Sequence, residues 1–79
     1  MNDYIATFHT HYGAMKFHNE CVKNGTPSST APVPRKLSSS CGICVKFESD
    51  TWRAAEDAED MEACYRCDGA GYVKKYAAP

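Results

Sequence analysis

Four cysteines in the second half of the chain have the type and spacing for metal binding or for sulfur chemistry. Cys41 and Cys44 form one C-x-x-C pair, Cys64 and Cys67 form a second pair, and 19 residues separate the two pairs. Two such pairs can supply four thiolates to one tetrahedral zinc ion. A single accessible cysteine can instead act as a thiolate nucleophile. The sequence therefore offers two alternatives, a zinc site and a reactive thiol, which compete for Cys41.

The residues around Cys41 favour a reactive thiol. Small hydroxyl residues and a glycine leave its sulfur reachable, and nearby basic residues favour the thiolate form.

The zinc alternative takes four thiolates as ligands, those of Cys41, Cys44, Cys64 and Cys67. The second pair extends to a C-x-x-C-x-G-x-G unit at residues 64–71, which resembles one repeat of the cysteine-rich zinc region of J-protein chaperones. The first pair fits less well, because residues three apart on a strand point to opposite faces. Its two thiolates could chelate one ion only if the chain turns at Gly42.

Length and composition restrict the class of protein. A chain of 79 residues forms one domain, and a net charge of -1 argues against nucleic-acid binding, which usually needs a basic excess. No apolar run approaches the ~20 residues of a membrane span. An acidic residue stands near the N-terminus where a signal peptide carries positive charge, and five cysteines fit a secreted disulfide framework poorly. We therefore expect a cytoplasmic protein whose clustered cysteines serve metal or thiol chemistry.

Side-chain periodicity predicts four strands and two helices. Alternating apolar residues indicate the strands, and a three-turn amphipathic pattern after the N-cap Thr10 indicates the first helix. Prolines restrict the second strand to a sheet edge. The elements are expected at Tyr4–His9, Tyr12–Asn24, within Thr26–Pro34, at Ile43–Phe47, from Ser49 or Asp50 to about Met61, and at Tyr72–Tyr76. This order predicts an α+β, ferredoxin-like β-α-β-β-α-β domain over residues 1–79, with an antiparallel sheet and both helices on one face.

Several short segments along most of the chain match those of one family. They are Phe8-His9-Thr10, the helix with Ala14 and Met15, Gly25-Thr26-Pro27, Pro34-Arg35, and Leu37-Ser38-Ser39-Ser40-Cys41-Gly42. On these segments the chain resembles the selenium/sulfur (Se/S) carrier proteins, a family of small bacterial domains. The Cys64/Cys67 unit departs from the family pattern, which keeps zinc under consideration as a bound metal.

The resemblance implies a thiol mechanism and protein partners. The Cys41 sulfur is then the carrier atom. It accepts sulfur or selenium from a donor protein as a persulfide or perselenide and relays it to an acceptor protein. The resemblance also implies that a guanidinium, hydroxyl groups and backbone amides stabilise the terminal anion, and the residues expected to do so are Arg35, Ser38, Ser39, Ser40 and Gly42. Cys44 could resolve the adduct by attack on the carrying sulfur. A carrier takes part in transfer without necessarily catalysing it, so the sequence leaves open whether the protein is an enzyme.

Two further interpretations start from the same cysteines. The C-G-I-C pair resembles the redox motif of thioredoxins, but there the first cysteine opens a helix whose dipole stabilises the thiolate, and here a strand is expected to follow. A small interaction domain with packed cysteines is the remaining alternative, since cysteine is among the most buried residue types. On the apolar face of the first helix, Cys21 is expected to be buried and His18 half-buried.

Overall fold

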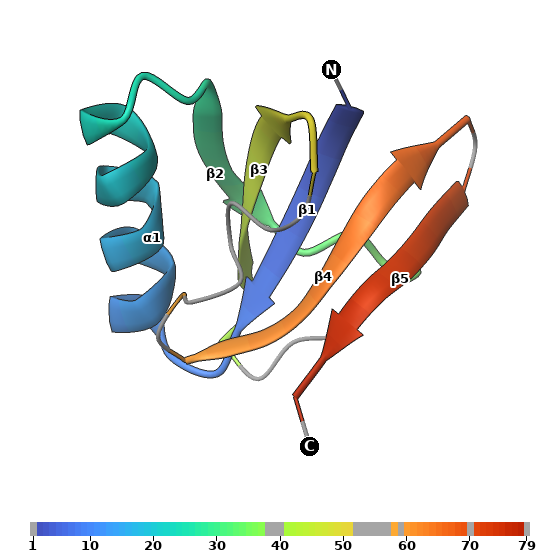
Figure 1. Ribbon diagram of the computed structural model, residues 1–79. Coiled ribbons are helices and arrows are strands. Elements are labelled where there is room, and N and C mark those ends of the chain that lie inside the picture. The colour runs from blue at the N-terminus through green and yellow to red at the C-terminus, as the bar shows by residue number, and fades with distance from the viewer. Residues whose placement is uncertain (1, 38–40, 52–57, 59, 70, 79) are drawn as a thin grey trace.

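The protein is described by a computed structural model that covers residues 2–37, 41–51, 58, 60–69 and 71–78. These residues form one α-helix and five β-strands, with the helix on one side of a single twisted sheet (Figure 1). The elements are β1 (Asn2–Phe8), α1 (His11–Lys23), β2 (Ser28–Pro32), β3 (Ile43–Ser49), β4 (Met61–Asp68) and β5 (Gly71–Ala77).

The five strands form one antiparallel sheet in the order β2-β3-β1-β4-β5. Central strand β1 pairs with β3, where Thr7 lies opposite Cys44, and with β4, where Ala6 lies opposite Cys64. The segment Tyr4–Phe8 is buried at every position. A strand covered on both faces needs no polar alternation, which explains the continuous run of uncharged residues in this segment.

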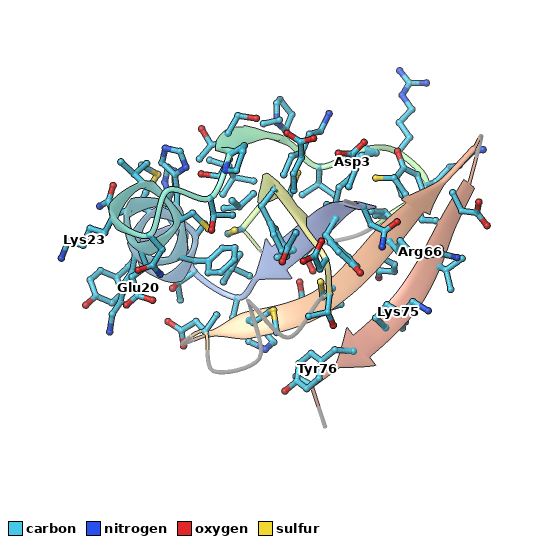
Figure 2. The ribbon with its side chains drawn as sticks, turned by 45° about the horizontal axis from the view of Figure 1, so that its top comes forward. Asp3, Glu20, Lys23, Arg66, Lys75 and Tyr76 are labelled. Carbon is cyan, nitrogen blue, oxygen red and sulfur yellow. The ribbon has the colours of Figure 1, made fainter. Side chains whose placement is uncertain are left out.

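The main apolar core lies between α1 and the sheet. The rings of Phe8 and Phe17 lie 5.6 Å apart in a tilted arrangement, and Phe17 meets Phe47 edge to face at 5.2 Å. Such geometries suit the ring quadrupoles and add to the stabilisation from burial. Glu20 and Lys23 point away from the sheet (Figure 2). The buried face of the helix consists of Gly13, Ala14, Phe17 and Cys21.

Residues 33–37, which follow β2, cross the sheet face opposite α1. In Figure 1 this segment passes behind β4 toward β5. Lys36 and Leu37 share a hollow there with Tyr65 of β4 and Tyr72 of β5. Thr7, whose side chain also faces away from the helix, is fully buried and donates a hydrogen bond to the carbonyl oxygen of Ala63 at 3.4 Å. Both faces of the central strands are therefore withdrawn from solvent.

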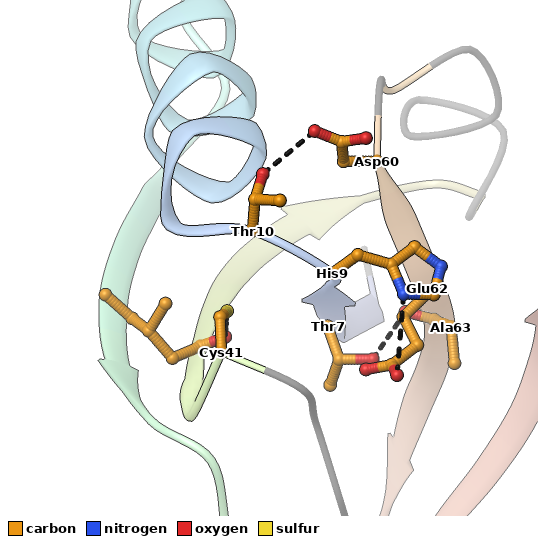
Figure 3. A network of polar contacts seen from close by, with 8 residues as sticks. Thr7, His9, Thr10, Cys41, Asp60, Glu62 and Ala63 are labelled. Atoms are coloured by element: carbon orange, nitrogen blue, oxygen red, sulfur yellow. Dashed lines mark hydrogen bonds and ion pairs between the residues drawn. The ribbon is translucent and has the colours of Figure 1, made fainter.

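The start of α1 is fastened to the segment that precedes β4. The Oγ1 atom of Thr10 accepts a hydrogen bond from the Gly13 amide at 3.1 Å and donates one to the Asp60 carboxylate at 2.8 Å (Figure 3). The backbone carbonyl of Asp60 also accepts from the His9 amide at 2.8 Å. Asp60 has a φ of 63°, a left-handed conformation that aspartate adopts more readily than most residues. The predicted N-cap is confirmed.

Several elements predicted from the sequence are observed. The first strand is β1, the first helix is α1, and the Pro-rich segment contributes the edge strand β2. The expected strands at Ile43–Phe47 and Tyr72–Tyr76 lie within β3 and β5. Cys21 is buried and His18 is half-buried, with its Nδ1 atom 2.8 Å from the Ser28 hydroxyl.

The ferredoxin-like sandwich with two helices is wrong. The part of the chain that the structure describes has one helix and five strands, where two helices and four strands were expected. The second helix was expected from Ser49 or Asp50 to about Met61, and residues 52–57 and 59 of that range lie outside the described residues. The clear difference is β4, which was not predicted as a strand. It pairs with β1 on one side and β5 on the other, and this two-sided pairing outweighs its weak strand propensity.

The packing of α1 predicts a large difference between two substitutions on the same helix. Phe17 is 4% exposed, whereas Met15 is 39% exposed. We expect Phe17→Ala to lower the free energy of unfolding by about 3–5 kcal/mol, because it removes buried surface and leaves a cavity. The matched Met15→Ala should change it by less than about 0.5 kcal/mol. Chemical denaturation measures both, and equal losses would contradict this account of the core.

Candidate functional site

All five cysteines are thiols without disulfide bonds, and they differ in their surroundings. Cys41 lies directly before β3, at the end of the sheet where α1 begins. Thr7 pairs with Cys44, and because β1 and β3 are antiparallel, the chain runs forward from this pair to the helix N-cap Thr10 and backward from it to Cys41, so both lie at the same end of the sheet. Figure 3 shows Cys41 below the first turn of α1. A helix N-terminus carries partial positive charge, and the start of α1 is the end of the helix on the Cys41 side of the sheet.

Cys41 is half-buried and packs beside Ile43 against the core on the α1 side. Its thiol donates a hydrogen bond to the Ile43 carbonyl oxygen at 3.4 Å. This bond needs the proton, so it stabilises the thiol and is lost when the thiolate forms. A nucleophilic Cys41 must therefore turn its sulfur away from that carbonyl.

Two backbone hydrogen bonds shape the loop that carries Cys41. The Val33 amide donates to the Gly42 carbonyl at 3.1 Å, which closes the neck of the loop. The Leu37 amide donates to the Pro34 carbonyl at 3.0 Å and closes a turn whose central residues are Arg35 and Lys36. Gly42 has a φ of 74°, a conformation that favours glycine. Of the expected anion-binding residues, Arg35 is exposed on this turn. Ser38, Ser39 and Ser40 lie outside the described residues.

Cys44 and Cys64 are fully buried, on opposite faces of the sheet. Cys44 faces away from α1, and its Sγ atom donates to the Pro32 carbonyl oxygen at 3.8 Å. Burial raises the pKa of the Cys44 thiol. Cys64 belongs to the core on the α1 side, where burial and then the nearby Cys67 raise its pKa to about 12. Neither sulfur is available as a nucleophile in the folded protein at neutral pH.

Cys67 is half-buried and lies opposite Tyr72 of β5. Because Cys64 faces α1, the strand alternation directs Cys67 to the other face. Burial is the main cause that raises the pKa of Cys67, and the carboxylate of Asp3 adds to it, while Lys46 acts in the opposite direction. Cys41 and Cys67 are thus the two half-buried thiols of the chain, and they face different sides of the sheet.

The structure does not bring the four cysteines of the zinc hypothesis together. The chain does bend at Gly42, as that hypothesis requires, but within each C-x-x-C pair one sulfur packs on the α1 side and the other faces away. Across the described residues, no group of three or more His, Cys, Asp or Glu side chains could hold a metal ion. A four-thiolate zinc site is therefore not present among these thiols.

Sequence reasoning missed the helix start beside Cys41. In thioredoxins the helix follows the first cysteine in the sequence, whereas here the strand β3 follows Cys41, as expected. The helix at this end of the sheet is α1, which follows β1 about 30 positions before Cys41 in the chain. The pairing of β1 with β3 brings the start of α1 to the same end of the sheet as Cys41. The Thr10 cap was visible in the sequence, but its position at the same end of the sheet as Cys41 depends on strand register.

Comparison with models of known protein families shows to which family this chain is related. A family model described as "Putative Se/S carrier protein-like" matches residues 3–63. The chain belongs to this family. The matched region of this Se/S carrier-like protein includes Cys41 and Cys44 and ends before Cys64 and β5. Searches of curated proteins and of solved structures gave no match. None of the helices within the described ranges has the length and hydropathy to cross a membrane.

Exposure predicts which thiols an alkylating reagent reaches in the folded protein. We expect iodoacetamide to label Cys41 and Cys67, since both are half-buried, and to label the buried Cys21, Cys44 and Cys64 only after denaturation. Peptide mass spectrometry with and without guanidinium measures the labelling. Rapid native labelling of Cys44 or Cys64 would contradict the described packing.

The raised pKa of Cys64 predicts a loss of stability at alkaline pH. Folding keeps this thiol protonated from its ordinary pKa of 9.0 up to about 12, while the unfolded chain ionises above 9.0. The stabilisation is complete below pH 9.0 and is lost as the pH rises toward 12, by at most roughly 4 kcal/mol. Guanidinium unfolding between about pH 8 and pH 11 should show a steeper decline for wild type than for Cys64→Ala. Parallel curves would contradict this assignment.

Proposed function

We propose that this protein carries sulfur or selenium, with the Cys41 sulfur as the carrying atom. The observation that carries the proposal is the position of Cys41, a half-buried thiol beside the start of α1 within the region matched by the Se/S carrier-like family. Burial and raised pKa values make Cys44 and Cys64 poor alternatives. A further alternative for the carrying atom, the Cys67 sulfur, lies beyond the residues that match the family model.

The loading step is a transfer between thiols. The Cys41 thiolate attacks the outer sulfur of a donor persulfide, R–S–SH, and forms a persulfide on Cys41. The donor sulfur leaves as its thiolate and takes up the proton released by Cys41, so no external oxidant or reductant is needed. Selenium follows the same route as a perselenide. An acceptor thiolate then attacks the outer atom and regenerates Cys41.

Local structure accounts for how an anion on Cys41 is tolerated. The hydrogen bond from the thiol to the Ile43 carbonyl is given up, and the positive end of α1 offsets part of that loss. Arg35 lies on a turn whose next residues, Lys36 and Leu37, line a hollow on the sheet face opposite α1, so the proposal relies on the start of α1 and on the serines that precede Cys41 rather than on Arg35. The donor and acceptor proteins are the partners that such a carrier needs.

Cys44 has no step in the proposed transfer. Attack on an adduct at Cys41 requires both sulfurs on one side of β3, and the buried Cys44 faces away from α1 while Cys41 packs on the α1 side. An external thiol on the acceptor therefore completes the transfer.

Sulfur loading tests the proposed role of Cys41. Incubation with a cysteine desulfurase and cysteine should give a labile adduct of one sulfur atom on the wild-type protein, seen by mass spectrometry and removed by dithiothreitol. Cys41→Ser should abolish the adduct because it removes the nucleophile. The matched Cys67→Ser should retain it. Failure of the wild type to load, or loading that persists in Cys41→Ser, would refute the proposal.

A further inference from the structure

A second candidate site lies away from Cys41, at the opposite end of the sheet. A cavity of about 460 Å³ opens there, with a size typical of small-ligand sites. The side chains that matter for its chemistry are Asp3, Ile5, Lys46, Glu48, Cys67 and Tyr72. We call this cavity the Cys67 hollow.

Strand register brings these side chains to one face. Asp3 lies opposite Glu48 and Ile5 lies opposite Lys46 in the pairing of β1 with β3. Cys67 lies opposite Tyr72 in the pairing of β4 with β5. All of them alternate with residues that face α1, so they share the face that the helix leaves uncovered. These six side chains therefore come from four paired strands, β1, β3, β4 and β5, and Pro27 with Ser28 and Ser29 of β2 completes the lining.

The charges around the hollow suit a zwitterion. Asp3 and Glu48 are like charges directly opposite each other on neighbouring strands, an arrangement that destabilises a sheet. An ammonium group bound between the two carboxylates would remove that repulsion. Lys46 comes next on the same face and can pair with a carboxylate. One α-amino acid group carries an ammonium and a carboxylate, the two charges that this set of side chains would bind.

The wall of the hollow adds a sulfur nucleophile. Cys67 is half-buried there, with the Ile5 side chain and the Tyr72 ring lining the same space. Lys46 and Asp3 are both close enough to influence the Cys67 thiol, the first favouring its thiolate and the second opposing it. An ammonium group held by Asp3 would offset that opposing charge. Both Cys67 and Tyr72 lie beyond the region that matches the Se/S carrier-like family.

We propose that the Cys67 hollow binds a zwitterionic aminothiol disulfide of the cystine type, and that Cys67 takes one half of it as a mixed disulfide. The Cys67 thiolate attacks one sulfur of R–S–S–R, a new S–S bond forms, and the other half leaves as a thiolate that takes up the Cys67 proton. The disulfide is the oxidant, so electrons balance without another reactant. This site is separate from Cys41 and does not depend on the carrier role.

The test compares disulfides that differ in charge. The reduced full-length protein is incubated with L-cystine, with cystamine, which has only ammonium groups, with dithiodipropionate, which has only carboxylates, or with uncharged hydroxyethyl disulfide. Intact-mass and peptide mass spectrometry follow the adducts. We expect L-cystine to modify Cys67 faster than any of the other three. Modification confined to other cysteines, or equal rates for all four disulfides at Cys67, would overturn the proposal.

Variants separate recognition from intrinsic reactivity. Asp3→Asn and Lys46→Met should each slow the reaction of L-cystine at Cys67 about threefold, the size of one exposed ion pair. The uncharged disulfide should correct for any change in the reactivity of Cys67 itself, because it has no charged group to bind. Lys23→Met, on the outer face of α1, is the matched control and should leave the rate unchanged. Equal slowing by Lys23→Met and Lys46→Met would reject the assigned charge pairing. Peptide mapping of the wild-type protein shows directly which cysteine carries the adduct, so the test does not need a Cys67→Ser variant that folds.

Discussion

The alternation of side chains along β-strands is the constraint on which the cysteine chemistry depends. Cys64 and Cys67 are three residues apart in β4, so they face opposite sides of the sheet. The bend at Gly42 precedes β3, yet Cys41 still packs on the α1 side while Cys44 faces away. Each C-x-x-C pair has the spacing to chelate a metal, but in the folded protein the four thiols lie in four different surroundings. One consequence is that burial withdraws some thiols from reaction while Cys41 and Cys67 stay half-buried.

The two half-buried thiols are placed by different parts of the fold. Cys41 depends on the neck of the 33–42 loop and on the pairing of β1 with β3, which together set it beside the start of α1. Cys67 depends on the hairpin of β4 and β5, which extends the sheet past the residues that match the family model. The family fold and the additional hairpin therefore each present one thiol, on opposite faces. This arrangement allows the two sulfurs to serve separate reactions.

Local patterns predicted much of the fold, and long-range pairing decided the rest. The helix period around Phe17, the Thr10 cap and the alternation at Ile43–Phe47 all gave elements that the structure contains. The sequence does not predict β4, because its C-x-x-C-x-G-x-G unit resembles a zinc-binding region and its strand conformation comes from partners on both sides. Cys41 was found by its local sequence. Its position beside α1, and the meeting of Asp3, Lys46 and Cys67 in one hollow, depend on register between distant segments. No local pattern carries that information.

The central claim is that Cys41 acts separately from Cys44, Cys64 and Cys67. Competition between zinc and sulfur loading tests it most directly, because a shared metal site and a carrier thiol cannot use the same sulfur at once. Loading of Cys41 by a desulfurase is measured with and without one equivalent of Zn²⁺ per chain, with the enzyme checked in parallel on an unrelated acceptor. The account predicts equal loading of Cys41 in both cases, with the protein folded throughout. Zinc that binds one ion per chain through all four thiols and blocks loading would contradict it.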